Sequence, residues 1–198
     1  MYSVSKSLLM PILLMCYLSF LTFQARMFYQ QRFCILALIL HCLGDILLLF
    51  PRTYGKRFML SGIVSFFIGH ISYTLWFTKS GIPLSEKEGL VTLFFMMIVQ
   101  YFLYRYVMLS SFRKFVPLVI LYSFGLVALA VVISSTLGNT ERFYAPLISL
   151  IGVFFFYFSD YCVARRAIRV PLFGQMVIMS TYVTAQTLII TGMLLMQI

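Results

Sequence analysis

Apolar residues fall in seven long runs along this chain, and short basic interruptions separate them. Each run approaches the roughly 20 residues that a helix needs to cross a hydrocarbon core about 30 Å thick. The pattern therefore predicts an all-α fold, a polytopic transmembrane helix bundle of about seven spans. The predicted spans cover residues 7–23, 33–50, 58–77, 89–107, 115–135, 143–163 and 172–195.

The first run has features of a signal peptide, because Lys6 precedes the apolar stretch 8–20. No small-residue cleavage site follows this stretch, so we expect a retained helix. No linker between the runs is long or polar enough to separate domains, and the sequence has no visible internal repeat. Residues 1–198 are therefore predicted to form a single integral membrane domain.

The composition agrees with a membrane protein and excludes a soluble domain. Hydrophobic residues make up 62% of the 198 residues and charged residues 10%, which is more apolar surface than a core of this size can enclose. The formal net charge of +10 comes from short Lys and Arg clusters between apolar runs. Such clusters indicate that the basic residues determine topology and contact membrane lipids, rather than bind nucleic acid. The four cysteines lie within apolar runs and form no CxxC pair, so we expect buried structural thiols.

The distribution of basic residues also orients the predicted helices. Ten of the 15 Lys and Arg residues belong to the N-terminus and to the second, fourth and sixth loops, and five lie on the opposite side. By the positive-inside rule, we expect a cytoplasmic N-terminus and an external C-terminus. The small size and the tight loops suit a bacterial inner membrane.

Two of the five acidic residues, Asp45 and Asp160, lie inside apolar runs. A charged side chain at the centre of a membrane helix costs roughly 2.5 to 3.5 kcal/mol on insertion scales, and such residues usually mark a functional site. The predicted topology brings both acids to the cytoplasmic leaflet, with Asp45 about 8 Å deep. We interpret the pair as one shared site. In the structural alternative, each acid pairs with a nearby arginine, such as Arg52 or Arg165.

Histidine and tyrosine side chains accompany the aspartates. His41 lies four residues before Asp45 and therefore shares its helix face. His70 and Tyr73, three residues apart, share a face of the next predicted helix. In straight helices His70 lies about 10 Å deeper than Asp45, so His41 could connect the two. A packing role is the alternative for each histidine and for Tyr73.

Two glycines, one lysine and a run of phenylalanines add to the predicted site. Gly62 and Gly69 would allow a neighbouring helix to approach the helix that carries His70. We interpret Lys6 primarily as a charge that determines topology; its alternative role is to bind a lipid head group. Most of the aromatic residues are expected to face lipid or the core, although the run 154–156, three phenylalanines, could form one wall of an acyl-chain groove.

Several short motifs resemble those of a known membrane family. These are Leu43-Gly44-Asp45, then Phe66-Phe67-Ile68-Gly69-His70-Ile71-Ser72-Tyr73, and much later Phe158-Ser159-Asp160. In this order and at these spacings they resemble the GD, FxxGHxxY and SD motifs of the YhhN-type lysoplasmalogenase family. The stretch SKSLLMP, residues 5–11, is similar to the Lys-containing start of that family, and residues 182–186 fall where its last helix lies. The resemblance covers nearly the whole chain.

The resemblance implies hydrolysis of the vinyl ether bond of a lysoplasmalogen, a single-chain lipid, to a fatty aldehyde and a glycerophospho-alcohol. This reaction needs a proton donor together with an anion that stabilises an oxocarbenium ion, and two nearby carboxyl groups can supply both. Asp45 and Asp160 are then the acid and the base, with neither role assigned. His41, His70, Tyr73 and Ser159 would be supporting or substrate-positioning residues. Lys6 and the cytoplasmic arginines would hold the lipid phosphate, and no cofactor is implied.

Three other functions remain open on the sequence. Two Asp and two His residues can bind zinc, which would make a metal-dependent lipid hydrolase, but there is no third His and no HxxxH or HExxH spacing. Paired intramembrane acids also occur in small proton- or cation-coupled carriers, although the chain lacks the repeats typical of carriers. The third alternative is a lipid-binding or assembly protein without catalytic activity.

Overall fold

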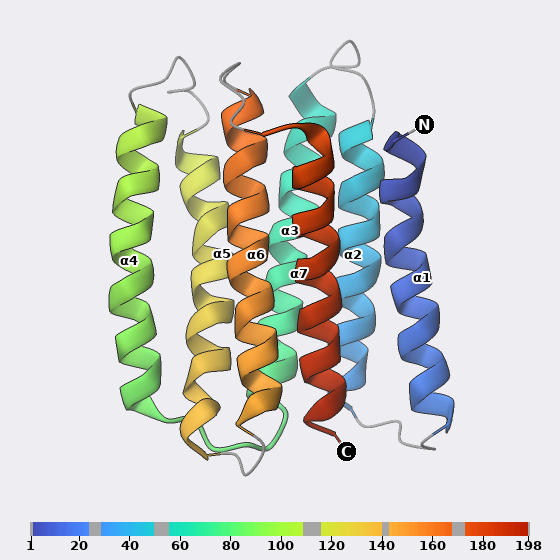
Figure 1. The fold of residues 1–198 in the computed structure, drawn as a ribbon, viewed down its shortest axis with the longest axis vertical. Helices are drawn as coiled ribbons and strands as arrows, with labels where there is room; N and C mark the ends of the chain where they lie inside the picture. The colour runs from blue at the N-terminus through green and yellow to red at the C-terminus, as the bar shows by residue number, and fades with distance from the viewer. Residues whose placement is uncertain are drawn as a thin grey trace. The chain divides into compact units, whose positions relative to one another are not determined.

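The computed structural model describes residues 2–23, 29–49, 56–108, 116–139, 143–167 and 173–197. Within these ranges the chain forms seven α-helices, one short 3-10 helix and no strand (Figure 1). The predicted all-α class is therefore confirmed. The elements are α1 (Tyr2–Phe23), α2 (Gln31–Leu49), α3 (Lys56–Thr78), α4 (Glu86–Met108), α5 (Val116–Ser135), η3 (Leu137–Asn139), α6 (Tyr144–Ala167) and α7 (Gln175–Leu195).

Each helix covers most of one predicted apolar run, and several extend beyond it. Helix α4 begins at Glu86 rather than at residue 89, directly after Ser85. The Ser85 hydroxyl donates to the Glu88 carboxylate, and the Ser85 amide donates to the Ser135 carbonyl. Polar groups at the first turn thus add residues to α4 that hydropathy alone does not detect.

Four described stretches are long and apolar enough to cross a membrane. They are Gln31–Leu48, Arg57–Thr78, Tyr144–Val163 and Gln175–Leu195. Two shorter apolar helical stretches, Leu9–Thr22 and Ile120–Ser135, accompany them in the described residues. These lengths agree with the thickness of a bilayer core, and they make the chain a membrane protein.

The chain divides into two compact units. In the first, Met1–Gly81, helix α2 packs against both α1 and α3. In the second, Ile82–Ile198, helices α4, α5, α6 and α7 pack in chain order, each against the next. The single domain expected over residues 1–198 stays a prediction.

Small residues bring α6 and α7 together in the second unit. A Cβ atom added at Gly152 would lie 2.8 Å from the Ala185 carbonyl oxygen, closer than real Cβ contacts. The Ser149 hydroxyl donates to the Ile189 carbonyl across the same seam, at 3.1 Å. Close backbone approach over small residues, with a hydroxyl bond across it, is the packing expected of membrane helices.

All four cysteines are free thiols. Cys34 and Cys162 are buried and Cys42 is half-buried, as the sequence predicted for structural thiols. The same prediction is wrong for Cys16, which is exposed. Its neighbour Tyr17 is fully buried, because successive helical residues point about 100° apart and only one face of α1 is covered.

Candidate functional site

In the first unit, the predicted polar residues gather around His41. His41 and Asp45 lie one turn apart on α2, and both side chains are fully buried. The ring of His41 contacts two rings on α3: its centroid is 5.0 Å from that of His70 and 5.2 Å from that of Tyr73, on which it is stacked. Phe66 completes the cluster, with its centroid 5.4 Å from that of His41. His41 thus contacts His70, as its suggested connecting position requires, and it also stacks on Tyr73, a contact that the sequence did not predict.

The orientation of His41 is fixed from two sides. Its Nδ1 atom lies 2.7 Å from the carbonyl oxygen of Ala37, one turn earlier on α2. Because a carbonyl only accepts hydrogen bonds, Nδ1 carries the hydrogen and donates it. On the other side, a Cβ atom added at Gly69 would lie 2.6 Å from Cε1 of the His41 ring. The ring therefore lies directly on the α3 backbone.

Glycine allows this close contact, as predicted for both positions on α3. A Cβ atom at Gly62 would lie 3.1 Å from the Leu48 side chain and 3.4 Å from the Gly44 carbonyl oxygen. On α2, a Cβ atom at Gly44 would lie 2.7 Å from two atoms of the Phe66 ring. Ser65 adds a hydrogen bond of 2.6 Å from its hydroxyl to the Leu40 carbonyl. The Gly-Asp and FxxGHxxY motifs thus form one helix–helix interface.

Asp160 lies in the second unit, half-buried on α6. The hydroxyl of Tyr122, on α5, donates to its Oδ2 atom at 2.5 Å. Sequence reasoning missed Tyr122. The sequence signal for Tyr122 is weak, because tyrosine is common in this chain and the contact depends on how α5 is rotated toward α6.

A second hydrogen-bonded group ties three helices beside this pair. The Tyr157 hydroxyl, on α6, donates to the side-chain oxygen of Gln100 on α4. The amide nitrogen of Gln100 donates to the Ser123 hydroxyl on α5, and Ser123 donates to the Ile120 carbonyl at 2.8 Å. Sequence reasoning also missed this group, although an amide inside an apolar run is a usable signal for interhelical bonding.

Ser159, the other residue of the Ser-Asp motif, faces a different helix. Its buried hydroxyl donates to the Ile178 carbonyl of α7 at 3.1 Å. The contact binds α6 to α7, so the predicted supporting role of Ser159 is compatible with positioning the helix that carries Asp160.

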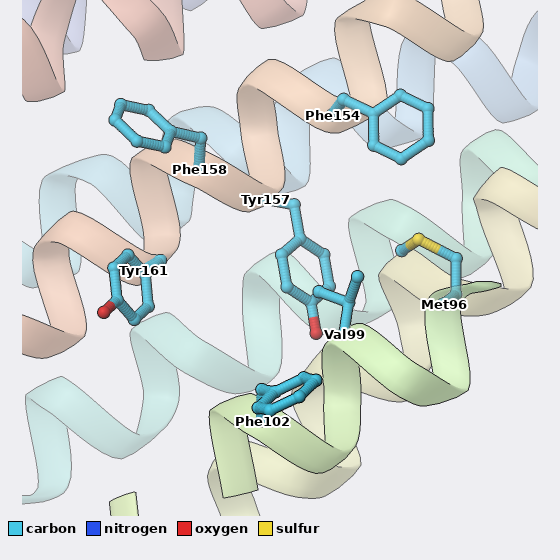
Figure 2. Close-up of a pocket in the computed structure, with 7 residues that line it drawn as sticks. All are labelled: Met96, Val99, Phe102, Phe154, Tyr157, Phe158 and Tyr161. Atoms are coloured by element: carbon cyan, nitrogen blue, oxygen red, sulfur yellow. The ribbon is translucent and has the colours of Figure 1, made fainter. Parts of the chain in front are cut away.

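An apolar groove of about 540 Å³ lies beside Tyr157 in the same unit (Figure 2). Its volume is within the range of about 300 to 1,000 Å³ typical of small-molecule sites. Aromatic side chains dominate the lining, and Figure 2 shows the ring of Tyr157 between the Phe102 ring of α4 and the Phe154 and Phe158 rings of α6. The lining residues are Met96, Val99 and Phe102 of α4, and Phe154, Tyr157, Phe158 and Tyr161 of α6.

The predicted phenylalanine wall is only partly present. Phe154 lines the groove. Phe156 is fully buried instead, with its ring centroid 5.4 Å from that of Tyr182 on α7. Phe155 is exposed and does not line this groove. Three consecutive helical residues point in three directions about 100° apart, so they cannot share one wall.

The remaining predicted contacts involve both units of the chain or residues that the structure does not describe. Asp45 and Asp160 belong to different units, so their meeting in one site stays a prediction. Lys6 lies in α1, but its side chain is outside the described residues, and so is Arg52. Among the residues that the structure describes, no three His, Cys, Asp or Glu side chains form a group that could hold a metal ion.

Helices of bilayer length, glycine seams and buried polar clusters together define a polytopic helical membrane protein with intramembrane acids. The chain matches the YhhN family over residues 1–193 and belongs to that family, the lysoplasmalogenase family. The resemblance inferred from the three motifs is thereby confirmed. No curated protein and no solved structure matches the chain significantly.

Proposed function

We propose that this protein is a membrane-embedded hydrolase that cleaves the vinyl ether bond of lysoplasmalogens, with Asp45 and Asp160 as acid and base. Membership of the YhhN family over almost the entire chain is the observation that carries this proposal. The surroundings of the two aspartates support it. Each lies on a helix within an apolar run. Asp45 is fully buried one turn from the buried His41, and Asp160 accepts a hydrogen bond from Tyr122.

The reaction begins with transfer of a proton from one carboxyl group to the vinyl carbon that is not bonded to oxygen. The resulting oxocarbenium ion is stabilised by the other, ionised carboxylate, as in glycoside hydrolysis. Water then adds to the cationic carbon and gives up a proton to that carboxylate. The hemiacetal collapses to a fatty aldehyde and a glycerophospho-alcohol. One water is consumed, and no oxidant or reductant is needed.

The groove beside Asp160 suits the single hydrocarbon chain of this substrate. Tyr157 lines the groove and lies one turn from Asp160 on α6, so the groove and a carboxyl group are about one helical turn apart along the same helix. A lyso-lipid has the same arrangement, with its scissile bond where the chain meets the glycerol. We further propose that Lys6 and the cytoplasmic arginines bind the phosphate, in an inner membrane with the N-terminus cytoplasmic.

Purified protein incubated with a lysoplasmalogen should release fatty aldehyde. The matched saturated alkyl-ether lipid should release none, because it has no double bond to protonate. Asp45→Asn and Asp160→Asn should each abolish release while the unfolding temperature stays close to that of the wild type. Cleavage of both lipids would contradict the acid-catalysed mechanism. Absence of aldehyde together with proton or cation flux in proteoliposomes would favour a carrier instead.

A further inference from the structure

We infer that Tyr122 is a positioning residue for the Asp160 carboxyl group. This inference rests on the proposed function, because it assumes that Asp160 takes part in the reaction. The Tyr122 hydroxyl donates to Oδ2 of Asp160 at 2.5 Å, across 38 positions of sequence and between α5 and α6. Bonds from a hydroxyl to an ionised carboxylate are about 2.5 to 2.7 Å long and stronger than bonds between neutral groups. The contact therefore has the geometry of a bond that orients a carboxylate.

The hydrogen bonds next to this pair hold its two helices in place. Tyr157 lies three residues before Asp160 on α6, and it donates to Gln100. Ser123 follows Tyr122 on α5, and it accepts from the same Gln100. One amide thus connects the helical turn that carries Asp160 with the turn that carries Tyr122. Sliding or rotation of α5 against α6 would break this connection as well as the Tyr122 bond.

A third contact restrains α6 from the side of α7. Ser159 donates to the Ile178 carbonyl, and Gly152, two turns earlier, meets the α7 backbone closely. With α6 held against both α5 and α7, the position of the Asp160 carboxyl group depends on the side-chain torsions of that residue. The Tyr122 hydroxyl restricts those torsions. Catalytic groups need to be held within about 0.5 Å of the productive geometry, so such a restraint matters for turnover.

Tyr122→Phe tests this role, because it removes one hydroxyl and keeps the ring. Loss of a hydrogen bond to a charged group should lower kcat by roughly tenfold to a hundredfold. KM should stay within about twofold, since Tyr122 does not line the groove. Tyr144→Phe is the matched control: Tyr144 is on the same helix as Asp160 and is 52% exposed. It should leave both constants within about twofold of the wild type.

A thermal-unfolding cycle tests the bond itself without any assay of activity. Tyr122→Phe should lower the unfolding temperature of the wild type but not that of an Asp160→Ala variant, which has already lost the acceptor. Equal losses in both backgrounds would overturn the inference, and so would an unchanged kcat in an active Tyr122→Phe protein. If the wild type itself releases no aldehyde, the proposed function fails and the positioning role fails with it. An active wild type with an unaffected Tyr122→Phe variant overturns the positioning role alone.

Discussion

Substitution of Gly69 by alanine tests the α2–α3 interface at its closest point. The new Cβ atom would lie 2.6 Å from Cε1 and 2.7 Å from Nδ1 of His41, where real Cβ atoms are essentially never found within 3.0 Å. The His41 ring cannot easily move away, because its Nδ1 atom is hydrogen-bonded to the Ala37 carbonyl oxygen and the ring is stacked on Tyr73. The substitution should therefore strain the packing of α2 on α3.

Two opposing effects set the size of this change. Overpacking a well-packed contact typically costs about 1 to 3 kcal/mol. Replacement of glycine by alanine inside a helix returns about 0.5 to 1 kcal/mol, because the unfolded chain loses freedom. The net expectation is a loss of up to about 2.5 kcal/mol in the free energy of unfolding. For a chain of this length, that loss corresponds to a fall of up to about 10 °C in the unfolding temperature.

Gly62→Ala is the matched control on the same helix. Its Cβ atom would meet the Leu48 side chain at 3.1 Å, and Leu48 is 38% exposed, so it can turn aside. We expect this variant to be as stable as the wild type or slightly more stable.

The single tryptophan, Trp76, reports on the unit that contains both glycines. It is fully buried on α3, so its fluorescence in detergent should follow unfolding of this interface. The two glycine variants can then be compared by their midpoints. If Gly69→Ala is as stable as Gly62→Ala, His41 does not lie on the α3 backbone and the proposed packing is wrong.

Three other predictions follow from the packing, the groove and the topology. Gln31→Leu removes the acceptor shared by two buried donors of the first unit and should cost about 2 to 4 kcal/mol; a thermal midpoint equal to the wild type would contradict it. Val99→Trp fills the groove and should raise KM for long-chain lyso-lipids more than for short-chain ones, whereas equal changes for both would argue against a chain site there. A membrane-impermeant thiol reagent added to intact cells should label Glu141→Cys and leave Tyr54→Cys unlabelled; the reverse pattern would invert the topology.

The sequence predicts the helices well because membrane thickness dictates their length. An apolar run of about 20 residues has few ways to satisfy its backbone in lipid other than as a helix. The contact between His41 and the α3 residues is also accessible from sequence. Spacings of three and four place polar side chains on one face, and glycines mark where a second helix can approach.

The bond between Tyr122 and Asp160 could not be predicted in the same way. Spacing along a helix defines which residues share a face, but it does not define how one helix is rotated and shifted against another. A shift of one residue along α5 would replace Tyr122 with Leu121 or Ser123 at this position. The groove is similar, because its lining combines residues of α4 and α6 that no single periodicity connects.

In both Gly44-Asp45 and Ser159-Asp160, the residue before the aspartate contacts the next helix closely, which explains why this residue is small. Gly44 meets the Phe66 ring of the next helix so closely that a Cβ atom would lie 2.7 Å from it. Ser159 meets the next helix through its hydroxyl, which donates to the Ile178 carbonyl. In both cases the first residue lies in the seam with the following helix. The aspartate, rotated by about 100° from it, must then lie beside that seam. A larger residue at the first position would separate the two helices and displace the carboxyl group that follows it.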